Sequence, residues 1–186
     1  VVAELYPNLK VRSADEVDAA VAVIGLDPGQ NFTHADCCNP LPGERIVGIT
    51  FRGQGVVVHT IDCRNLLNYE KQMDRWLDLA WHDGLHAATH PVRIEVTIRN
   101  GAGVMGHICT LIGDQKANIS DMYFVDRKPD YFKLIIDLEL RDVSQLHMVL
   151  TALEAENDVA EINRHRDPTL AQDITSFEGE WDKVGV

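Results

Sequence analysis

Between residues 91 and 166 the spacing of apolar residues alternates between two periods, and this alternation constrains the fold more than any other feature of the chain. Residues 92–98 place apolar side chains at every second position, as a strand with one buried face does. Residues 104–112 and 143–153 instead space them three or four apart, the period of an amphipathic helix. Three further segments read as strands: 117–126, 131–142 and 157–166. The order predicts a ferredoxin-like βαββαβ unit, an antiparallel four-stranded sheet with both helices on one face, whose other face must be covered or dimerise.

A smaller unit precedes this one and is expected to be rich in strands. Its two short apolar runs, residues 45–51 and 55–61, are joined by glycines that suit a hairpin loop. The chain is therefore predicted to be an α+β protein, in which a small β-rich module is followed by the βαββαβ domain. We expect this division: 1–30, an N-terminal helix and linker; 31–68, the β-rich module; 69–90, a helix and linker; 91–166, the βαββαβ domain; 167–186, a mobile acidic tail.

Three of the four cysteines and two of the eight histidines lie in the small module. Cys37, Cys38, His59 and Cys63 offer three thiolates and an imidazole, a set that suits tetrahedral structural zinc. Such a small module buries little apolar surface, and structural zinc contributes on the order of 10 kcal/mol to comparable folds. Neighbouring residues on a strand point to opposite faces, so the adjacent cysteines need a kinked backbone to share an ion. The alternatives are cysteines that pack as small hydrophobic residues, or a Cys38–His59 nucleophile and base, for which no orienting acid is evident.

A glycine-rich turn at residues 100–106 leads from the first strand of the βαββαβ unit into its first helix. Gly101 and Gly103 would let backbone N–H groups at the helix N-terminus approach a carboxylate, while Asn100 offers an acceptor to an ammonium group. Asn118 and Ile119, at the start of the next strand, would add an amide and an apolar wall. These groups fit recognition of an amino acid by its two charged ends. The alternative is that the glycines only make a tight turn.

Three histidines with regular spacing are not expected to form a metal site. His82, His86 and His90 fall four residues apart, but Gly84 and Pro91 interrupt the helix that would align them.

Composition excludes some classes of function. The 186 residues carry a formal net charge of −12, which argues against non-specific nucleic-acid binding. Within residues 31–67, however, the charges of three acidic and three basic side chains cancel. A neutral module of this kind could still bind structured RNA by recognising its shape. No apolar run approaches the roughly 20 residues that span a bilayer, and no secretory signal is evident, which indicates a cytoplasmic protein. The first residue is Val, so the chain is expected to be a piece of a longer protein.

The two halves together resemble one family. Cys-Cys-Asn-Pro-Leu-Pro-Gly at residues 37–43, the strand Gly-Val-Val-Val-His at 55–59 and the final Cys63 resemble the cysteine-containing module of the RelA/SpoT family of (p)ppGpp synthetase/hydrolases. The βαββαβ half, with Asn-Gly-Ala-Gly-Val at 100–104, is similar to the ACT domain that ends those chains. The resemblance covers roughly residues 30–166. It implies a regulatory C-terminal piece of a stringent-response enzyme, whose catalytic domains precede this region.

The resemblance also implies cofactors and partners. The family's cysteine module is described as zinc-finger-like and ribosome-contacting, which implies zinc at the four residues named above. It makes ribosomal RNA a candidate partner, with tRNA, for Arg45, Arg52 and Arg64. ACT domains commonly form side-by-side dimers with small amino acids at the interface. The implied ligand is a branched-chain amino acid, valine or isoleucine, and the implied site joins two copies: Asn100, Gly101, Ala102, Gly103, Val104 and Met105 of one, and Asn118, Ile119 and Ser120 of the other. The alternative is a docking and dimerisation module without a small-molecule ligand.

Overall fold

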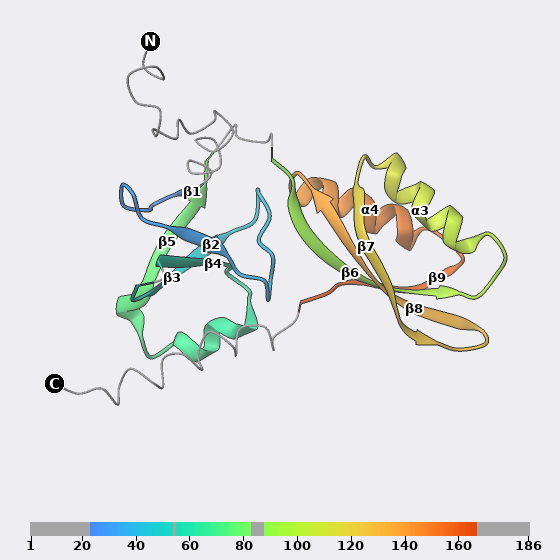
Figure 1. Ribbon diagram of the computed structural model, residues 1–186, viewed down its shortest axis with the longest axis horizontal. Coiled ribbons are helices and arrows are strands. Elements are labelled where there is room, and N and C mark those ends of the chain that lie inside the picture. The colour runs from blue at the N-terminus through green and yellow to red at the C-terminus, as the bar shows by residue number, and fades with distance from the viewer. Residues whose placement is uncertain (1–22, 54, 83–87, 167–186) are drawn as a thin grey trace, which may run out of the picture.

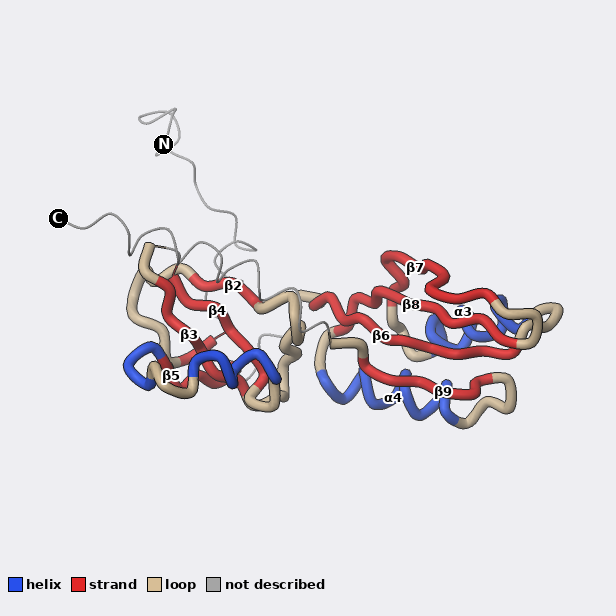
Figure 2. The backbone as a smooth tube through the Cα atoms, turned by 90° about the horizontal axis from the view of Figure 1, so that it is seen from below, coloured by secondary structure: helices blue, strands red, loops and turns tan. Residues whose placement is uncertain are grey.

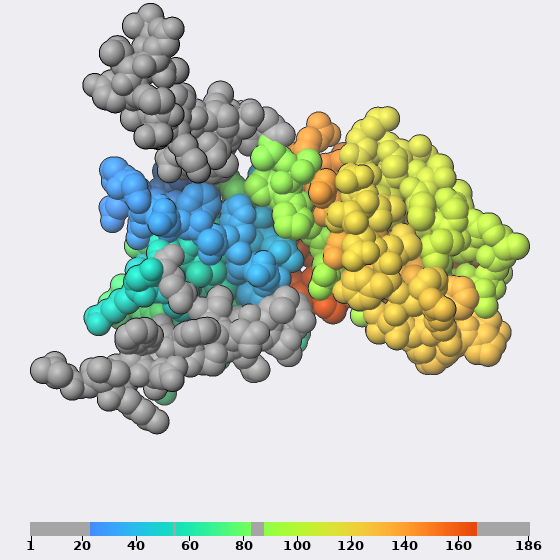
Figure 3. Space-filling view, in the orientation of Figure 1, coloured from blue at the N-terminus to red at the C-terminus, as the bar shows by residue number. Residues whose placement is uncertain are grey.

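Two sheets, one in each half of the chain, organise the protein (Figure 1). The computed structural model describes residues 23–53, 55–82 and 88–166. We call residues 23–82 the N-terminal domain and residues 88–166 the C-terminal domain. In the space-filling view the two domains form adjacent lobes (Figure 3). Most of the expected N-terminal helix and the whole expected acidic tail lie outside the described residues.

The predicted hairpin of the small module is confirmed. Strands β3 (Ile46–Phe51) and β4 (Gly55–Thr60) pair antiparallel, because their β-branched residues and the glycines of the connecting turn favour that arrangement. Strand β2 (Phe32–His34) adds to β4 in parallel, and β5 (Trp76–Trp81) adds to β3 in antiparallel fashion. Strand β1 (Val23–Ile24) pairs with β5, which gives the order β1-β5-β3-β4-β2.

Both faces of this sheet are buried, which explains why β3 and β4 read as continuous apolar runs rather than as alternating strands. Val47, Ile49 and Val57 face a core that also contains the three cysteines and Tyr69. The alternate positions face a second core, whose buried members are Val23, Ile46, Val56, Val58 and Leu79.

The stretch after Cys63 does not form the helix and linker that the sequence suggested. It forms two short 3-10 helices, η1 (Arg64–Tyr69) and η2 (Met73–Arg75), and then strand β5. Without β5, strand β3 would carry unpaired backbone groups at its edge, and pairing Ile46 with Leu79 both satisfies them and buries apolar surface. This tertiary gain outweighs the helix propensity of the charged and leucine-rich segment.

The C-terminal domain confirms the predicted βαββαβ order. Its elements are β6 (His90–Arg99), α3 (Val104–Asp114), β7 (Asn118–Arg127), β8 (Tyr131–Leu140), α4 (Val143–Glu154) and β9 (Val159–Arg164). The antiparallel sheet has the order β7-β8-β6-β9, and both helices cover one face (Figure 2). Every second residue of β6 and β8 packs under the helices, including Ile94 and Ile136, which are fully buried.

The other face of this sheet carries ion pairs between side chains of neighbouring strands. Arg93 donates two hydrogen bonds to Asp137 across the β6–β8 pair, at 2.6 and 2.8 Å, and its guanidinium lies over the Tyr123 ring. Lys133 pairs with Glu95 at 2.7 Å on the same strands. Cross-strand ion pairs therefore stabilise this face, and the expectation that it is covered or dimerises stays a prediction.

No helix in the described ranges is both long and apolar enough to cross a membrane.

Candidate functional site

Four side chains from three separate segments converge at one end of the N-terminal sheet. Cys37 and Cys38 lie in the turn that follows β2, His59 is the fifth residue of β4, and Cys63 immediately precedes η1. All four residues are buried. The structure thus brings together the complete Cys₃His set that the sequence singled out.

A tight turn lets the two adjacent cysteines face the same point. Cys38 N and Asn39 N both donate to Ala35 O, at 3.3 and 2.8 Å, so residues 35–39 coil instead of continuing β2. In a coiled backbone successive side chains no longer point to opposite faces as they do on a strand. Asn39 has φ of +42°, a conformation that Asn tolerates better than most residues, and it ends the turn.

The spacing of the donor atoms matches a tetrahedral metal site. Cys37 Sγ lies 3.5 Å from His59 Nδ1 and 3.6 Å from Cys63 Sγ, and Cys38 Sγ lies 3.8 Å from the same nitrogen. All four donor atoms lie within 4.8 Å of one another. Zinc bonds of about 2.3 Å to sulfur and about 2.0 Å to nitrogen would place two sulfurs about 3.8 Å apart, and a sulfur and a nitrogen about 3.5 Å apart. The cluster can therefore hold a metal ion with little rearrangement.

The sulfurs of the cluster differ in how readily they ionise: hydrogen bonds to Cys37 and Cys63, together with burial, raise the pKa of Cys38, whereas the pKa of Cys63 is lowered. Thr60 N donates to Cys38 Sγ at 3.4 Å, and the backbone N–H of Asn65 bonds to the Cys63 thiolate. Hydrogen bonds from Cys37 and Cys38 lower the pKa of Cys63 despite its burial. Burial alone would lower the pKa of His59, but its hydrogen bonds to Cys37 and Cys63 raise it to about 9. A bound metal would displace that proton, and four protein ligands would leave no open position for catalysis.

Residues 39–44, which connect the cysteine turn to β3, pack against the C-terminal domain. Leu41 is fully buried and belongs to the core of that domain, although it comes from the N-terminal domain. Pro42 O accepts a hydrogen bond of 3.0 Å from Val143 N, at the start of α4. Gly43 is so close that an added Cβ would lie 2.9 Å from Val143 Cγ1. We call residues 39–44 the junction loop.

Arg164, the last residue of β9, ties the C-terminal domain to the same loop. Its Nη2 donates to the carbonyl oxygens of Cys38 and Asn39, at 3.0 and 2.7 Å, and to Glu44 Oε2 at 3.2 Å. Its Nη1 also bonds Glu44 Oε1. The Arg164 and Glu44 side chains are only 12% and 13% exposed, so this ion pair is largely shielded from water. Sequence reasoning missed this contact, because nothing local marks one of many surface-type arginines as the partner of a loop 120 residues away.

A second contact between the domains is aromatic. The rings of His34 (β2), Trp81 (β5) and His90 (β6) form a triangle with centroids 5.5 to 5.6 Å apart. His90 therefore packs at the boundary between the domains. Of the other two histidines spaced four residues apart, His82 is exposed and His86 lies outside the described residues. The structure does not show these three histidines gathered at one point.

The glycine-rich turn has the geometry expected of a helix N-terminus. Gly103 is the N-cap of α3 and has φ of +81°, and residues 101–103 are exposed. Asn100 Nδ2 donates to Pro129 O at 2.9 Å. The side-chain oxygen of Asn100 is the atom that could accept a hydrogen bond from a ligand. Val104 is buried and Met105 is half-buried beside the turn.

The second half of the expected ligand site lies at the opposite end of the sheet. Asn118 pairs with Glu139 in the β7–β8 register, whereas the turn follows Arg99, which pairs with Tyr131. The distance along β8 from Tyr131 to Glu139 is about 27 Å at roughly 3.4 Å per residue. One copy of the chain therefore does not bring the two halves together.

The polar side chains of that second half already have partners. Asn118 Nδ2 donates to Glu139 Oε2 at 3.0 Å, and Ser120 Oγ donates to Asp137 O at 3.2 Å. Ile119 packs against the core of the C-terminal domain.

The three arginines considered for RNA contact are all exposed but do not form one patch. Arg45 precedes β3 and Arg64 begins η1, so both lie at the end of the sheet that holds the cysteines. Arg52 lies in the β3–β4 turn at the other end.

Comparison with known protein families agrees with this two-domain architecture. The model of the RelA/SpoT RIS domain matches residues 21–82, and that of the ACT domain matches residues 86–164. The chain belongs to the RelA/SpoT family. It is a C-terminal regulatory region of that family, and we refer to its two halves below as the RIS domain and the ACT domain.

Individual relatives carry the names of (p)ppGpp enzymes. The chain is 32% identical to the GTP pyrophosphokinase rsh of Brucella ovis over 125 residues, which are 67% of this chain and 17% of the relative. It is 27% identical to the bifunctional (p)ppGpp synthase/hydrolase SpoT of Escherichia coli over 162 residues, 87% of this chain and 23% of the relative. The chain thus spans about a fifth of the length of these curated relatives, and the matched domains are the RIS and ACT parts.

Among solved structures, the ACT domain from the GTP pyrophosphokinase of Chlorobium tepidum is similar to this chain with a TM-score of 0.37 and 16% identity. The match covers 41% of this chain and 97% of that one.

Proposed function

We propose that this region senses a branched-chain amino acid, valine or isoleucine, and controls the catalytic domains of a cytoplasmic (p)ppGpp synthetase/hydrolase during the stringent response. One observation carries this proposal: the loop that leaves the Cys₃His cluster places Leu41 in the core of the ACT domain. A structural change in the ACT domain and one at the cluster would therefore both displace the junction loop. Control would be a population shift, limited by the difference in ligand affinity between two arrangements.

The amino acid would bind between two ACT domains in a homodimer. The exposed backbone of residues 101–103 and the oxygen of Asn100 would hold the charged ends of the ligand, and Val104, Met105 and Ile119 would surround its side chain. The separation of about 27 Å between the turn and Asn118 within one copy supports this arrangement, because a two-fold axis would bring the turn of each copy to the second strand of the other.

Strand β7 offers the surface for such a dimer. It is an edge strand of ten residues and carries the exposed apolar side chains Tyr123, Phe124 and Val125. An edge of this length is a template for pairing with another chain. Val125→Lys should therefore shift the chain toward monomers in sedimentation experiments at micromolar concentration, whereas Met148→Lys, an equally exposed apolar position on α4, should not. If the two variants affect dimerisation equally, β7 is not part of the dimer interface.

Zinc is the metal that we propose for the Cys₃His cluster, in a structural role. The match of donor spacing to tetrahedral zinc, the burial of all four ligands and the N–H bonds to two of the sulfurs support this choice. Purified protein should contain about one zinc per chain by mass spectrometry of the metal. Cys63→Ser should lose it, and Cys109→Ser, which changes a cysteine on α3 outside the cluster, should retain it.

Calorimetric titration of the zinc-loaded chain with the twenty amino acids tests the ligand. We expect saturable heat with valine or isoleucine, and a loss of that heat in Gly103→Val and Asn118→Ala. Gly113→Ala is the matched control, since Gly113 lies on α3 in open space. If both site variants remain folded and bind as the parent does, the proposed pocket is wrong.

A docking role without a small-molecule ligand is the second candidate. It is favoured by Asn118 and Ser120, whose side chains already have partners and need no ligand to satisfy them. In this account the RIS domain contacts ribosomal RNA, together with tRNA, through exposed arginines such as Arg52. Arg52→Glu should then reduce co-sedimentation with ribosomes, whereas Arg141→Glu, exposed on the ACT domain, should not. If none of the twenty amino acids gives saturable heat and Arg52→Glu reduces ribosome binding, the docking role is favoured.

A further inference from the structure

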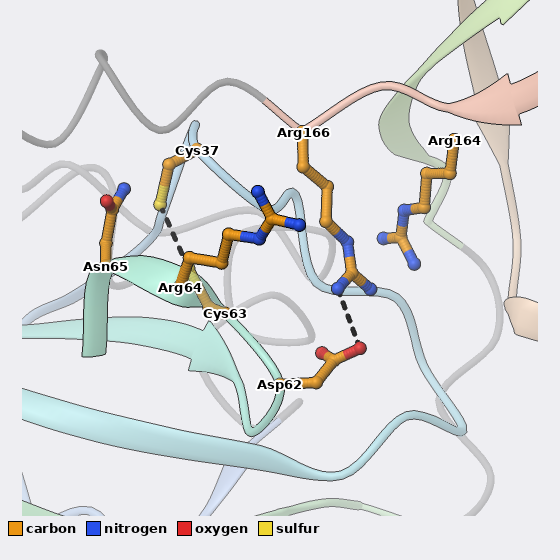
Figure 4. Close-up of a pocket in the computed structure, with 7 residues that line it drawn as sticks. All are labelled: Cys37, Asp62, Cys63, Arg64, Asn65, Arg164 and Arg166. Carbon is orange, nitrogen blue, oxygen red and sulfur yellow. Dashed lines mark hydrogen bonds and ion pairs between the residues drawn. The ribbon is translucent and has the colours of Figure 1, made fainter. Parts of the chain in front are cut away.

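A basic cavity lies beside the cysteine cluster, between the RIS and ACT domains. It has a volume of about 310 Å³ and is lined by seven residues: Cys37, Asp62, Cys63, Arg64, Asn65, Arg164 and Arg166. Three of these are arginines and only one is acidic, although the chain as a whole carries a net charge of −12. Figure 4 shows the arginines reaching toward the cavity from η1 and from the end of β9. The cavity is therefore a local concentration of positive charge.

The three arginines differ in how many partners they have. Both Nη atoms of Arg164 bond the junction loop, as described above. Arg166 Nη1 bonds Asp62 Oδ2 at 2.7 Å, and its Nη2 lies 4.0 Å from Glu44 Oε1. Arg64 has no ion-pair or hydrogen-bond partner within the described parts of the chain. Its guanidinium is thus free to bind an anion, and Arg166 still has its remaining N–H groups.

Asn65, which follows Arg64, independently indicates that a hydrogen-bond acceptor binds in the cavity. Asn65 is only 6% exposed, and its Nδ2 is buried without a hydrogen-bond partner among the described residues. A buried amide donor left unpaired destabilises the folded state, which points to an acceptor that binds there. Asn65 follows Arg64 in η1 and lines the same cavity, so one acceptor placed there would serve both side chains.

We propose that this cavity binds a phosphate group carried by a small molecule. Guanidinium groups favour phosphate because two parallel N–H bonds match its oxygens. A tetrahedral phosphate presents oxygens in several directions, and so could meet Arg64, Arg166 and Asn65 at once, which a planar carboxylate does less well. The volume is near the lower limit for ligand pockets, which fits inorganic phosphate or a short phosphomonoester better than a nucleic-acid strand. Such a ligand would contact both domains next to the junction loop.

The side-chain amide of Asn65 provides a direct readout. The full chain, labelled with ¹⁵N and loaded with zinc, is titrated at constant ionic strength with inorganic phosphate, glycerol 2-phosphate and a dinucleotide phosphodiester. The Asn65 Nδ2 signals are assigned by their absence in Asn65→Asp. We expect phosphate and the monoester to shift these signals saturably, and Arg64→Gln to weaken binding by about tenfold or more. Arg52→Gln, exposed at the far end of the sheet, should bind as the parent does.

Three outcomes would overturn the proposal. The first is that Asn65 does not respond to phosphate or to the monoester. The second is that Arg64→Gln and Arg52→Gln bind equally well, because binding would then follow general charge. The third is that the dinucleotide binds more tightly than the monoester, since that would assign the cavity to RNA. Zinc content measured before and after each titration ensures that phosphate has not removed the metal.

Discussion

Arg164 is a shielded side chain whose two Nη atoms both bond groups of the junction loop. Its guanidinium serves two backbone carbonyls and one carboxylate, all in the junction loop. An exposed ion pair usually stabilises a protein by at most about 1 kcal/mol, because water screens the charges. Here the two side chains are also largely shielded from water, so removing the arginine leaves the Glu44 carboxylate with only the Leu41 N–H at 2.7 Å and the Arg166 guanidinium at 4.0 Å.

Arg164→Met should lower the free energy of unfolding by about 2–4 kcal/mol, measured by urea denaturation. The matched control is Arg99→Met, which removes an arginine whose side chain is 59% exposed and pairs with Asp158. That variant should lose less than about 1 kcal/mol. If the two variants are destabilised equally, the junction contact contributes no more than a surface ion pair.

At the scale of elements, the meeting of β2, β5 and β6 should make stability depend on pH. Burial, with a contribution from His90, lowers the pKa of His34 to about 4, and burial also lowers the pKa of His90. The folded state therefore binds fewer protons than the unfolded state between the ordinary histidine pKa of about 6.5 and pH 4. Stability rises with pH across this window and is lost as the pH falls from about 6.5 toward 4.

His34→Phe removes this titration and keeps an aromatic ring in place. We expect the loss of stability between pH 6.5 and pH 4.5 to be smaller in the variant than in the parent, by up to about 3 kcal/mol. The zinc cluster also responds to acid, so the quantity to compare is the difference between the two proteins at equal zinc content. Parallel pH profiles would show that His34 does not titrate with unfolding.

The elements also show where reasoning from sequence succeeds. The βαββαβ half was predictable because each segment has one buried face, and alternation in β6 or helical spacing in α4 records that face directly. Strand β5 was not, since Trp76–Trp81 gives no clear period and is selected as a strand by the unpaired edge of β3. The four cluster residues were found by residue type alone. Their convergence depends on the coiled turn at residues 35–39, which the sequence hints at only through Asn39.

The junction loop and its partners escaped prediction for a different reason. Leu41 lies between two prolines in a loop, so local pattern gives it no role, yet it fills part of the ACT core. Contacts such as Arg164–Glu44 depend on how the two domains pack against each other. That packing is determined by residues of both domains, so no local sequence pattern predicts it. An alignment of co-varying pairs is the signal that would have found them.

For the whole molecule, the important point is that the metal cluster and the ACT domain share one loop. Cys37 and Cys38 immediately precede the junction loop, and Leu41, Pro42 and Glu44 attach it to the ACT domain. A metal ion at the cluster would fix the start of the loop, because a structural zinc site contributes on the order of 10 kcal/mol. The relative position of the domains should therefore depend on metal occupancy.

Removal of zinc by a chelator should loosen this junction without unfolding the ACT sheet. The sensitive amide is that of Val143, whose N–H is bonded to Pro42 O. Its hydrogen exchange should become at least about tenfold faster in the metal-free protein, a change of about 1.4 kcal/mol in local stability, while amides of β6 and β8 keep their protection.

Leu41→Ala is the companion variant, because it should speed exchange at Val143 with the zinc still bound, through the loss of a fully buried side chain. Cys109→Ser should change neither zinc content nor exchange at this amide. If the metal-free protein exchanges at Val143 as slowly as the zinc-loaded one, the cluster and the junction are independent, and a signal cannot pass between the two domains by this route. If instead Val143 and the β6–β8 amides accelerate together, the metal stabilises the whole chain rather than the connection between its domains.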